Sequence, residues 1–138
     1  MKIFEFYGRG ATEGTAIGEA FVINDFIGAW GVLDPVNGIF TDERQPSFLG
    51  RSFTGKVLIF RGAIGSSGWS MAIHQARLNG TAPAALVCQF TTAKLALGAA
   101  VSRLPTVTDC DEKIFEVACD GDIIFVDASA GRIEVRKS

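Results

Sequence analysis

The sequence predicts an α/β protein with a β-rich N-terminal half followed by a βαβ layer. Short apolar or β-branched segments, separated by glycines and turn signals, fill the first sixty residues. From Gly65 onward the apolar spacing becomes helical, and strand-like and helix-like segments then alternate. Such alternation is typical of parallel strands joined by right-handed helical crossovers. We therefore expect a β-rich unit packed beside a short parallel layer.

The N-terminal half is expected to hold five short strands. Each is apolar or β-branched and is bounded by glycine or polar residues; they span residues 2–7, 15–23, 30–34, 37–41 and 56–60. Pro35 and the Asn37-Gly38 pair predict a hairpin, because asparagine and glycine tolerate positive φ angles. The polar stretch 41–52 is expected to be an exposed connection.

The second half is expected to alternate between helices and strands. A first helix follows Gly65 and stops at Asn79-Gly80, since these residues favour a left-handed helix end. Asp109 or Asp111 is expected to cap the last helix. The remaining elements are a strand at 83–90, a helix at 93–100, a strand at 104–108, a helix at 112–119 and a hairpin at 120–135. Without linkers or repeats, residues 1–138 are expected to form a single domain.

Composition and charge exclude several classes of function. The net charge is -2 and no basic block occurs, so neither nucleic acid nor an anionic membrane is an expected partner. No apolar run approaches the roughly 18 residues that a membrane span needs. The N-terminal segment lacks the apolar core of a signal peptide, and the three cysteines form no CxxC pair, which together favour the cytoplasm. We expect the cysteines to be small buried hydrophobes and not metal ligands.

A Gly-Ser-Ser turn, Gly65 to Gly68, joins a predicted strand to a predicted helix. A helix start exposes unpaired N–H groups at the positive end of the helix dipole, and glycines let the backbone approach a ligand closely. Such a turn can hold a carboxylate or phosphate, or can stabilise a serine alkoxide that accepts a proton. Alternatively, Ser66 or Ser67 only caps the helix, which contributes about 1 kcal/mol. The residues alone leave both interpretations open.

His74 is the only histidine in the sequence. It lies about two helical turns beyond the serines, roughly 10–12 Å along the axis, so it is too distant to act as their base. With no GxSxG elbow either, a serine-hydrolase triad is not expected. His74 is either a structural or exposed helix residue, or the phosphoryl acceptor of a phosphohistidine carrier domain.

Five segments together resemble the small, swivelling-domain subunit of the aconitase X enzymes. They occur in the order "WGVLDPVNGIFTD", "QPSFLGRSFTGKVLIF", "GAIGSSGWS", "LNGTAPAALV" and "LGAAVSRLPTV", and the resemblance extends from about Gly14 to Asp127. It implies a swivelling β/β/α fold like the mobile fourth domain of aconitase. It also implies an iron–sulfur hydro-lyase, a dehydratase, built as a heterodimer of two chains.

The resemblance also implies how the work is divided between the chains. The aconitase X large subunit, the expected partner, supplies the iron–sulfur cluster and most of the substrate pocket. In this chain Ser66 is implied as the catalytic base that removes a proton next to a carboxylate, with Gly65, Ser67 and Gly68 as substrate-binding supports. The hydroxy-acid substrate expected from the resemblance is cis-3-hydroxy-L-proline, and the alternative is phosphomevalonate. A non-catalytic structural subunit, or the carrier domain, is the alternative of another class.

Two departures from the family pattern concern substrate recognition. Aconitase has a carboxylate-binding arginine after the serines, whereas this chain has Gly68, and many family members have His-Pro where this one reads Gln45-Pro46. Arg61 is a candidate to bind the carboxylate instead. A subunit that closes over another chain's pocket should also carry an apolar face near the turn. The aromatic candidates for that face are Trp30, Phe40, Phe48, Phe53 and Trp69.

Overall fold

The computed structural model describes residues 1–28, 33–64 and 68–137. Within these ranges three helices occur: α1 (Gly68–Asn79), α2 (Ala93–Val101) and α3 (Ile114–Val117). The strands are β1 (Lys2–Tyr7), β2 (Arg9–Gly10), β3 (Thr15–Ile27), β4 (Leu33–Asp34), β5 (Ile39–Phe40), β6 (Val57–Ala63), β7 (Ala85–Phe90), β8 (Thr106–Thr108), β9 (Ile123–Asp127) and β10 (Arg132–Lys137). Among the described helices, none has the length and apolar character needed to cross a bilayer.

Eight of the strands form one mixed sheet in the order β1-β10-β9-β3-β6-β7-β8-β2. The central strands β3, β6, β7 and β8 are mutually parallel, and the outer pairings are antiparallel. The two ends of the sheet, β1 and β2, are consecutive in the chain and separated only by Gly8. The sheet therefore curls back on itself. A Cβ on Gly8 would lie 2.4 Å from the Thr108 carbonyl oxygen, so only glycine fits at this closure.

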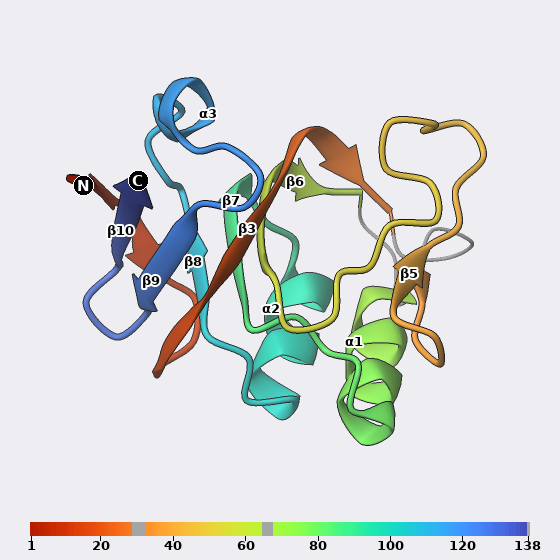
Figure 1. Ribbon diagram of the computed structural model, residues 1–138. Coiled ribbons are helices and arrows are strands. Elements are labelled where there is room, and N and C mark those ends of the chain that lie inside the picture. Colours follow the sequence, from red (N-terminus) through yellow and green to blue (C-terminus); the bar gives the residue numbers. More distant parts are fainter. Residues whose placement is uncertain (29–32, 65–67, 138) are drawn as a thin grey trace.

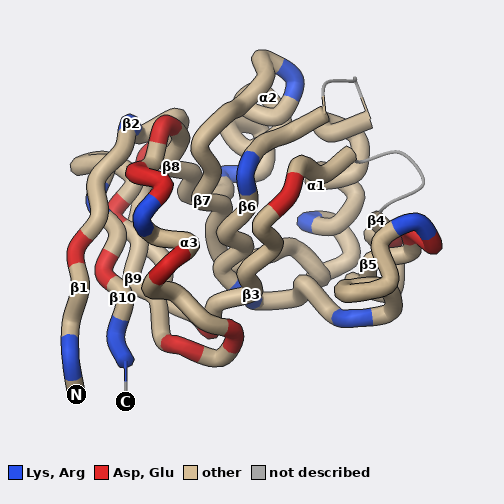
Figure 2. Tube along the Cα trace, turned by 90° about the horizontal axis from the view of Figure 1, so that it is seen from above, with Lys and Arg blue, Asp and Glu red and all other residues tan. Residues whose placement is uncertain are grey.

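The molecule has three layers, as Figures 1 and 2 show from two directions: strands β1, β10 and β9, then the parallel strands, then helices α1 and α2. Two hydrophobic clusters fill the spaces between the layers. The first lies between the helices and the sheet and includes Phe60, Trp69 and Leu95. The second lies inside the curl of the sheet and includes Ile59, Val107 and Ile133. Alternate residues of β6 thus face opposite cores, as a central strand requires.

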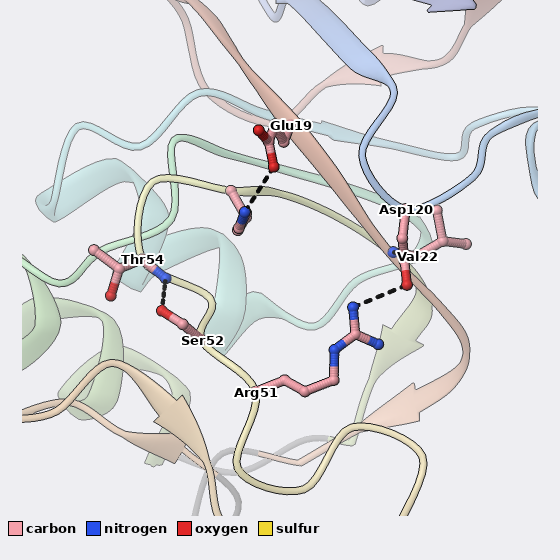
Figure 3. Close-up of polar contacts among 7 residues, drawn as sticks. Glu19, Val22, Arg51, Ser52, Thr54 and Asp120 are labelled. Atoms are coloured by element: carbon pink, nitrogen blue, oxygen red, sulfur yellow. Dashed lines mark hydrogen bonds and ion pairs between the residues drawn. The ribbon is translucent and has the colours of Figure 1, made fainter.

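The connection between β5 and β6 is tied to the sheet by polar contacts (Figure 3). Arg51 forms an ion pair with Asp120 at 2.9 Å and stacks over the ring of Phe21, 4.2 Å from its centroid. The other carboxylate oxygen of Asp120 accepts a hydrogen bond from the Val22 amide at 2.7 Å. Asp120, in the turn before β9, therefore contacts both the β5–β6 connection and the bulged strand β3. Phe48 and Asp42 are buried, so the expectation of a wholly exposed connection at 41–52 is wrong at these two positions.

Most of the elements expected from the sequence are confirmed. Helices α1 and α2, strands β7 and β8, and the final β9–β10 hairpin lie where the pattern predicts them. The β4–β5 hairpin is also confirmed, with Gly38 at a φ of +69°. The last helix is a correction: α3 has only four residues, and Lys113 occupies its N-cap without a side-chain hydrogen bond. Asp111 instead accepts a hydrogen bond from the Lys113 amide in the preceding turn.

Candidate active-site edge

The candidate site lies at the carboxyl edge of the parallel strands. Parallel strands end at the same edge of a sheet, and the connections that follow them gather there. The segment after β6 leads from Ile64 to the start of α1, and the segment after β7 leads through Thr92 to α2. Two helix N-termini, each the positive end of a helix dipole, therefore face this edge.

The serine turn predicted as the catalytic element is only partly within the described residues. Ser66, Ser67 and Gly65 lie outside them, so their predicted roles stay predictions. Gly68 is described: it is buried and is the first residue of α1. The next residue, Trp69, is fully buried and stacks on Phe60 of β6, with ring centroids 6.0 Å apart and an interplanar angle of 8°. This contact fixes the beginning of α1 against the sheet.

The start of α2 is packed closely against the start of α1. Thr92 is its N-cap, and the Thr92 hydroxyl oxygen accepts a hydrogen bond from the Leu95 amide at 3.1 Å. Ser70, in the first turn of α1, donates its hydroxyl to the Lys94 carbonyl at 2.8 Å. Gly98 brings the two helices together, since a Cβ there would lie 2.8 Å from Cα of Ser70. The starts of α1 and α2 are therefore packed against each other.

Arg61 is held by groups of its own chain on the side of β6 away from α1. Its guanidinium donates to the side-chain oxygens of Asn24 on β3 and Gln89 on β7. It also lies 3.7 Å from the Glu112 carboxylate and 4.3 Å from the ring centroid of Phe115. Arg61 and the start of α1 are therefore on opposite faces of the sheet. The expectation that Arg61 could bind a substrate carboxylate beside the serine turn gains no support from this placement.

Two further residues singled out in the sequence have clear positions. Gln45, which stands where many family members have histidine, donates its side-chain amide to Asp25 near the end of β3, at 3.2 Å. His74 is exposed in the middle of α1. It lies six residues beyond Gly68, about 9 Å along the helix axis. His74 is therefore not at the helix start, where the carrier hypothesis needs it.

The aromatic residues proposed for an apolar partner face belong instead to the core. Phe40, Phe48, Phe53 and Trp69 are all buried in the cluster under the helices, and Trp30 lies outside the described residues. Their phenylalanine rings pack edge to face, with centroids 4.9–5.3 Å apart around Phe40. Phe26, Ile64 and Phe90 are exposed apolar side chains at the ends of β3, β6 and β7, and sequence reasoning missed them. Local sequence gave no signal for them, because their proximity depends on strand register.

The cysteines do not form a site for an iron–sulfur cluster. In residues 1–28, 33–64 and 68–137, no three His, Cys, Asp or Glu side chains come together in a way that could hold a metal ion. Burial raises the pKa of Cys88 to about 11 and the pKa of Cys110 to about 12, which keeps both as neutral thiols, whereas a metal needs a thiolate. Cys119 is exposed, so the expectation of three buried cysteines is wrong for this one.

The layers, the two helix starts and the glycine-dependent closure together define a β/β/α swivel-type domain. The chain belongs to the aconitase X swivel domain family, whose model matches residues 5–135. Recognition of this family and of its fold from the sequence is therefore confirmed.

Known proteins support this assignment over nearly the whole chain. A relative from Methanosarcina mazei, the phosphomevalonate dehydratase small subunit, is 37% identical over 99% of this chain and 94% of its own length. The protein of the same name from Archaeoglobus fulgidus is 36% identical over 95% of this chain and 98% of its own. The crystal structure of Thermococcus kodakaraensis aconitase X in its holo-form matches with a TM-score of 0.89 at 31% identity, covering 96% of this chain and 98% of that one.

Proposed function

We propose that this chain is the small subunit of a phosphomevalonate dehydratase. Its class is established: it is a hydro-lyase small subunit of the aconitase X family. The observation that carries the finer proposal is the full-length similarity to two archaeal small subunits that bear this name. The relatives therefore favour the second of the substrates weighed from the sequence, and cis-3-hydroxy-L-proline becomes the competing outcome of the test.

The proposed role of this chain in the reaction is proton removal by Ser66. The Ser66 oxygen takes a proton from the carbon next to the substrate carboxylate. The electrons of the broken C–H bond form the new C=C bond, and the C–O bond of the next carbon breaks to release hydroxide. The hydroxide takes up a proton from solvent to become water, and Ser66 returns the proton that it removed to solvent. Two features of the described residues support this role. The starts of α1 and α2 meet beside the serine turn, and their N-termini favour negative charge at that point. No acidic residue occupies the first turn of either helix to oppose that effect.

The departure of hydroxide is assigned to the other subunit. The description of the relatives as small subunits supports a large-subunit partner, and we assign the iron–sulfur cluster and most of the substrate pocket to it. When bound, a Lewis-acid iron would assist the loss of hydroxide. A reducing compartment, the cytoplasm, suits three free cysteines.

The test is turnover by the two-chain complex. The chain is co-purified with the aconitase X-type large subunit of the same genome, and both phosphomevalonate and cis-3-hydroxy-L-proline are offered. We expect dehydration of phosphomevalonate, and we expect Ser66→Ala to lower kcat by about 10²–10⁴-fold, the usual contribution of a general base. Ser47→Ala, which changes an exposed serine in the β5–β6 connection, is the control, and its turnover should stay within about threefold of wild type. Turnover of hydroxyproline alone would overturn the substrate assignment. Full activity of the Ser66→Ala complex would show that Ser66 is not the base and leave the helix cap as its role.

A further inference from the structure

Three residues line up across the sheet at its carboxyl edge: Phe26 on β3, Gly62 on β6 and Phe90 on β7. Strand register pairs Gly62 with Phe26 on one side and with Phe90 on the other. The two phenylalanines are thus separated by a whole strand, and their backbones are about 9.5 Å apart. Their rings nevertheless stack, with centroids 5.9 Å apart and an interplanar angle of 21°.

The stack depends on the missing side chain of Gly62. A Cβ at that position would lie 2.8 Å from Cε1 of Phe26 and 2.9 Å from Cβ of Phe90. Both distances are far below van der Waals contact, so any larger residue would force the rings apart. The two rings therefore lean over an empty position and form one continuous apolar surface.

This surface is open to solvent and adjoins the serine turn. Phe26 is 43% exposed and Phe90 57% exposed, and Ile64, which follows β6 directly, is 58% exposed. We call Phe26, Ile64 and Phe90 the edge patch. Ile64 is the last described residue before the serine turn and precedes Ser66 by two positions in the sequence. Arg61, the nearest charged residue on β6, points to the opposite face of the sheet, where it contacts Phe115.

We propose that the edge patch is the surface on which the large subunit docks around its substrate pocket. This inference rests on the proposed function: if Ser66 acts on a substrate held by the other chain, that chain must approach within a few ångströms of Ile64. The rim of the partner's pocket then covers the edge patch. Aromatic side chains, phenylalanine among them, are enriched at the cores of protein–protein interfaces. Their burial also excludes water from the proton transfer.

The partner's matching surface is expected to be apolar. Because the edge patch presents three uncharged side chains, a charged rim would be left without partners when the two surfaces meet. The exposed apolar residues at the far end of α1 offer a contrast. Leu78 is 73% exposed but lies in the last turn of the helix, away from the carboxyl edge, and is not part of the proposed interface.

The test measures binding and not turnover. Titration calorimetry of the isolated chain with the purified large subunit gives the dissociation constant for wild type and for Phe90→Gln, Ile64→Gln and the control Leu78→Gln. Circular dichroism and thermal unfolding check the fold of each variant. We expect Phe90→Gln to weaken binding by about 30-fold or more, as for an interface hot spot. Ile64→Gln should weaken it by about tenfold, and Leu78→Gln should leave it unchanged.

The outcomes separate this inference from the proposed function. Unchanged affinity in both edge-patch variants overturns the docking surface, even if the wild-type complex turns over phosphomevalonate. If Phe90→Gln does not fold, Ile64→Gln decides, because Ile64 is an exposed residue beyond the end of β6. Equal weakening by Leu78→Gln would also overturn the inference, because it would show that loss of any exposed apolar side chain has the same effect. Conversely, Ser66→Ala should bind with wild-type affinity, so its loss of turnover reports on the chemistry alone.

Discussion

The replacement Gly98→Ala tests how the two helices at the candidate site are held. Gly98 is buried in α2, and an added Cβ would lie 2.8 Å from Cα of Ser70 and 3.3 Å from the carbonyl oxygen of Trp69. These are backbone atoms in the first turn of α1. They cannot move easily, because Trp69 is fully buried and stacked on Phe60. The methyl group therefore has no space unless one helix shifts.

Two effects of opposite sign decide the outcome of Gly98→Ala. Alanine favours a helix over glycine by about 1 kcal/mol. Overpacking against a fixed backbone costs about 1–3 kcal/mol, and a contact of 2.8 Å belongs in the upper part of that range. The net result should be a loss of about 1–2 kcal/mol in the free energy of unfolding. For a chain of this length, the melting temperature should fall by about 4–8 °C.

Urea unfolding followed by circular dichroism measures this change. Ala96→Gly in the same helix is the matched control. It reverses the propensity effect without touching α1, and should cost about 1 kcal/mol. If Gly98→Ala instead raises the free energy of unfolding by about 1 kcal/mol, the higher helix propensity of alanine accounts for the whole effect. That result would refute the close contact between the two helices.

Two further predictions concern titratable groups. Burial raises the pKa of Cys88 to about 11 and of Cys110 to about 12, so only Cys119 should react with iodoacetamide in the folded protein at pH 8. Each buried thiol contributes stability that is fully present below its unfolded pKa of about 8.5. This stability is lost as the pH rises toward the folded pKa, by about 1 kcal/mol per pH unit. When both cysteines are replaced with alanine, the urea concentration at the unfolding midpoint should therefore depend less on pH between about pH 9 and 11. Burial alone would raise the pKa of Asp122, but hydrogen bonds from Lys137 and the Cys119 amide lower it overall. The stability that the lowered pKa of Asp122 contributes is present above about pH 4 and is lost as the pH falls. Lys137→Met should therefore move the midpoint of acid unfolding to higher pH. An unchanged midpoint would contradict a stabilising contact between Lys137 and Asp122.

Local patterns predicted the parallel half of the fold well. The Asn79-Gly80 pair, the short apolar run at 83–90 and the proline at 105 each have a direct local effect on the backbone, so the elements they delimit are confirmed. The curled sheet could not be predicted in the same way. It depends on pairings between residues more than a hundred positions apart, such as Lys2 with Lys137, for which the sequence offers no local signal.

The same reasoning explains what was missed at the candidate site. Composition showed that aromatic residues were available for a partner surface, but not which of them the core would bury. Trp69 is buried because α1 packs its first turn on the sheet, whereas Phe90, the last residue of β7, is left exposed. The role of Gly62 follows from strand register alone, since its two neighbours in the sheet are 36 residues before it and 28 residues after it. Glycine motifs pointed to the carboxyl edge of the parallel strands, and tertiary packing determined which side chains are exposed there.

The most direct test of the account follows the proton that Ser66 is proposed to remove. Phosphomevalonate carrying deuterium on the carbon next to its carboxylate is incubated with the reconstituted two-chain complex, and NMR measures the release of deuterium to water. The wild-type complex should release it with turnover, and the Ser66→Ala complex, assembled with unchanged affinity, should release it at least about 100-fold more slowly. Release at the wild-type rate from the Ser66→Ala complex would contradict the account.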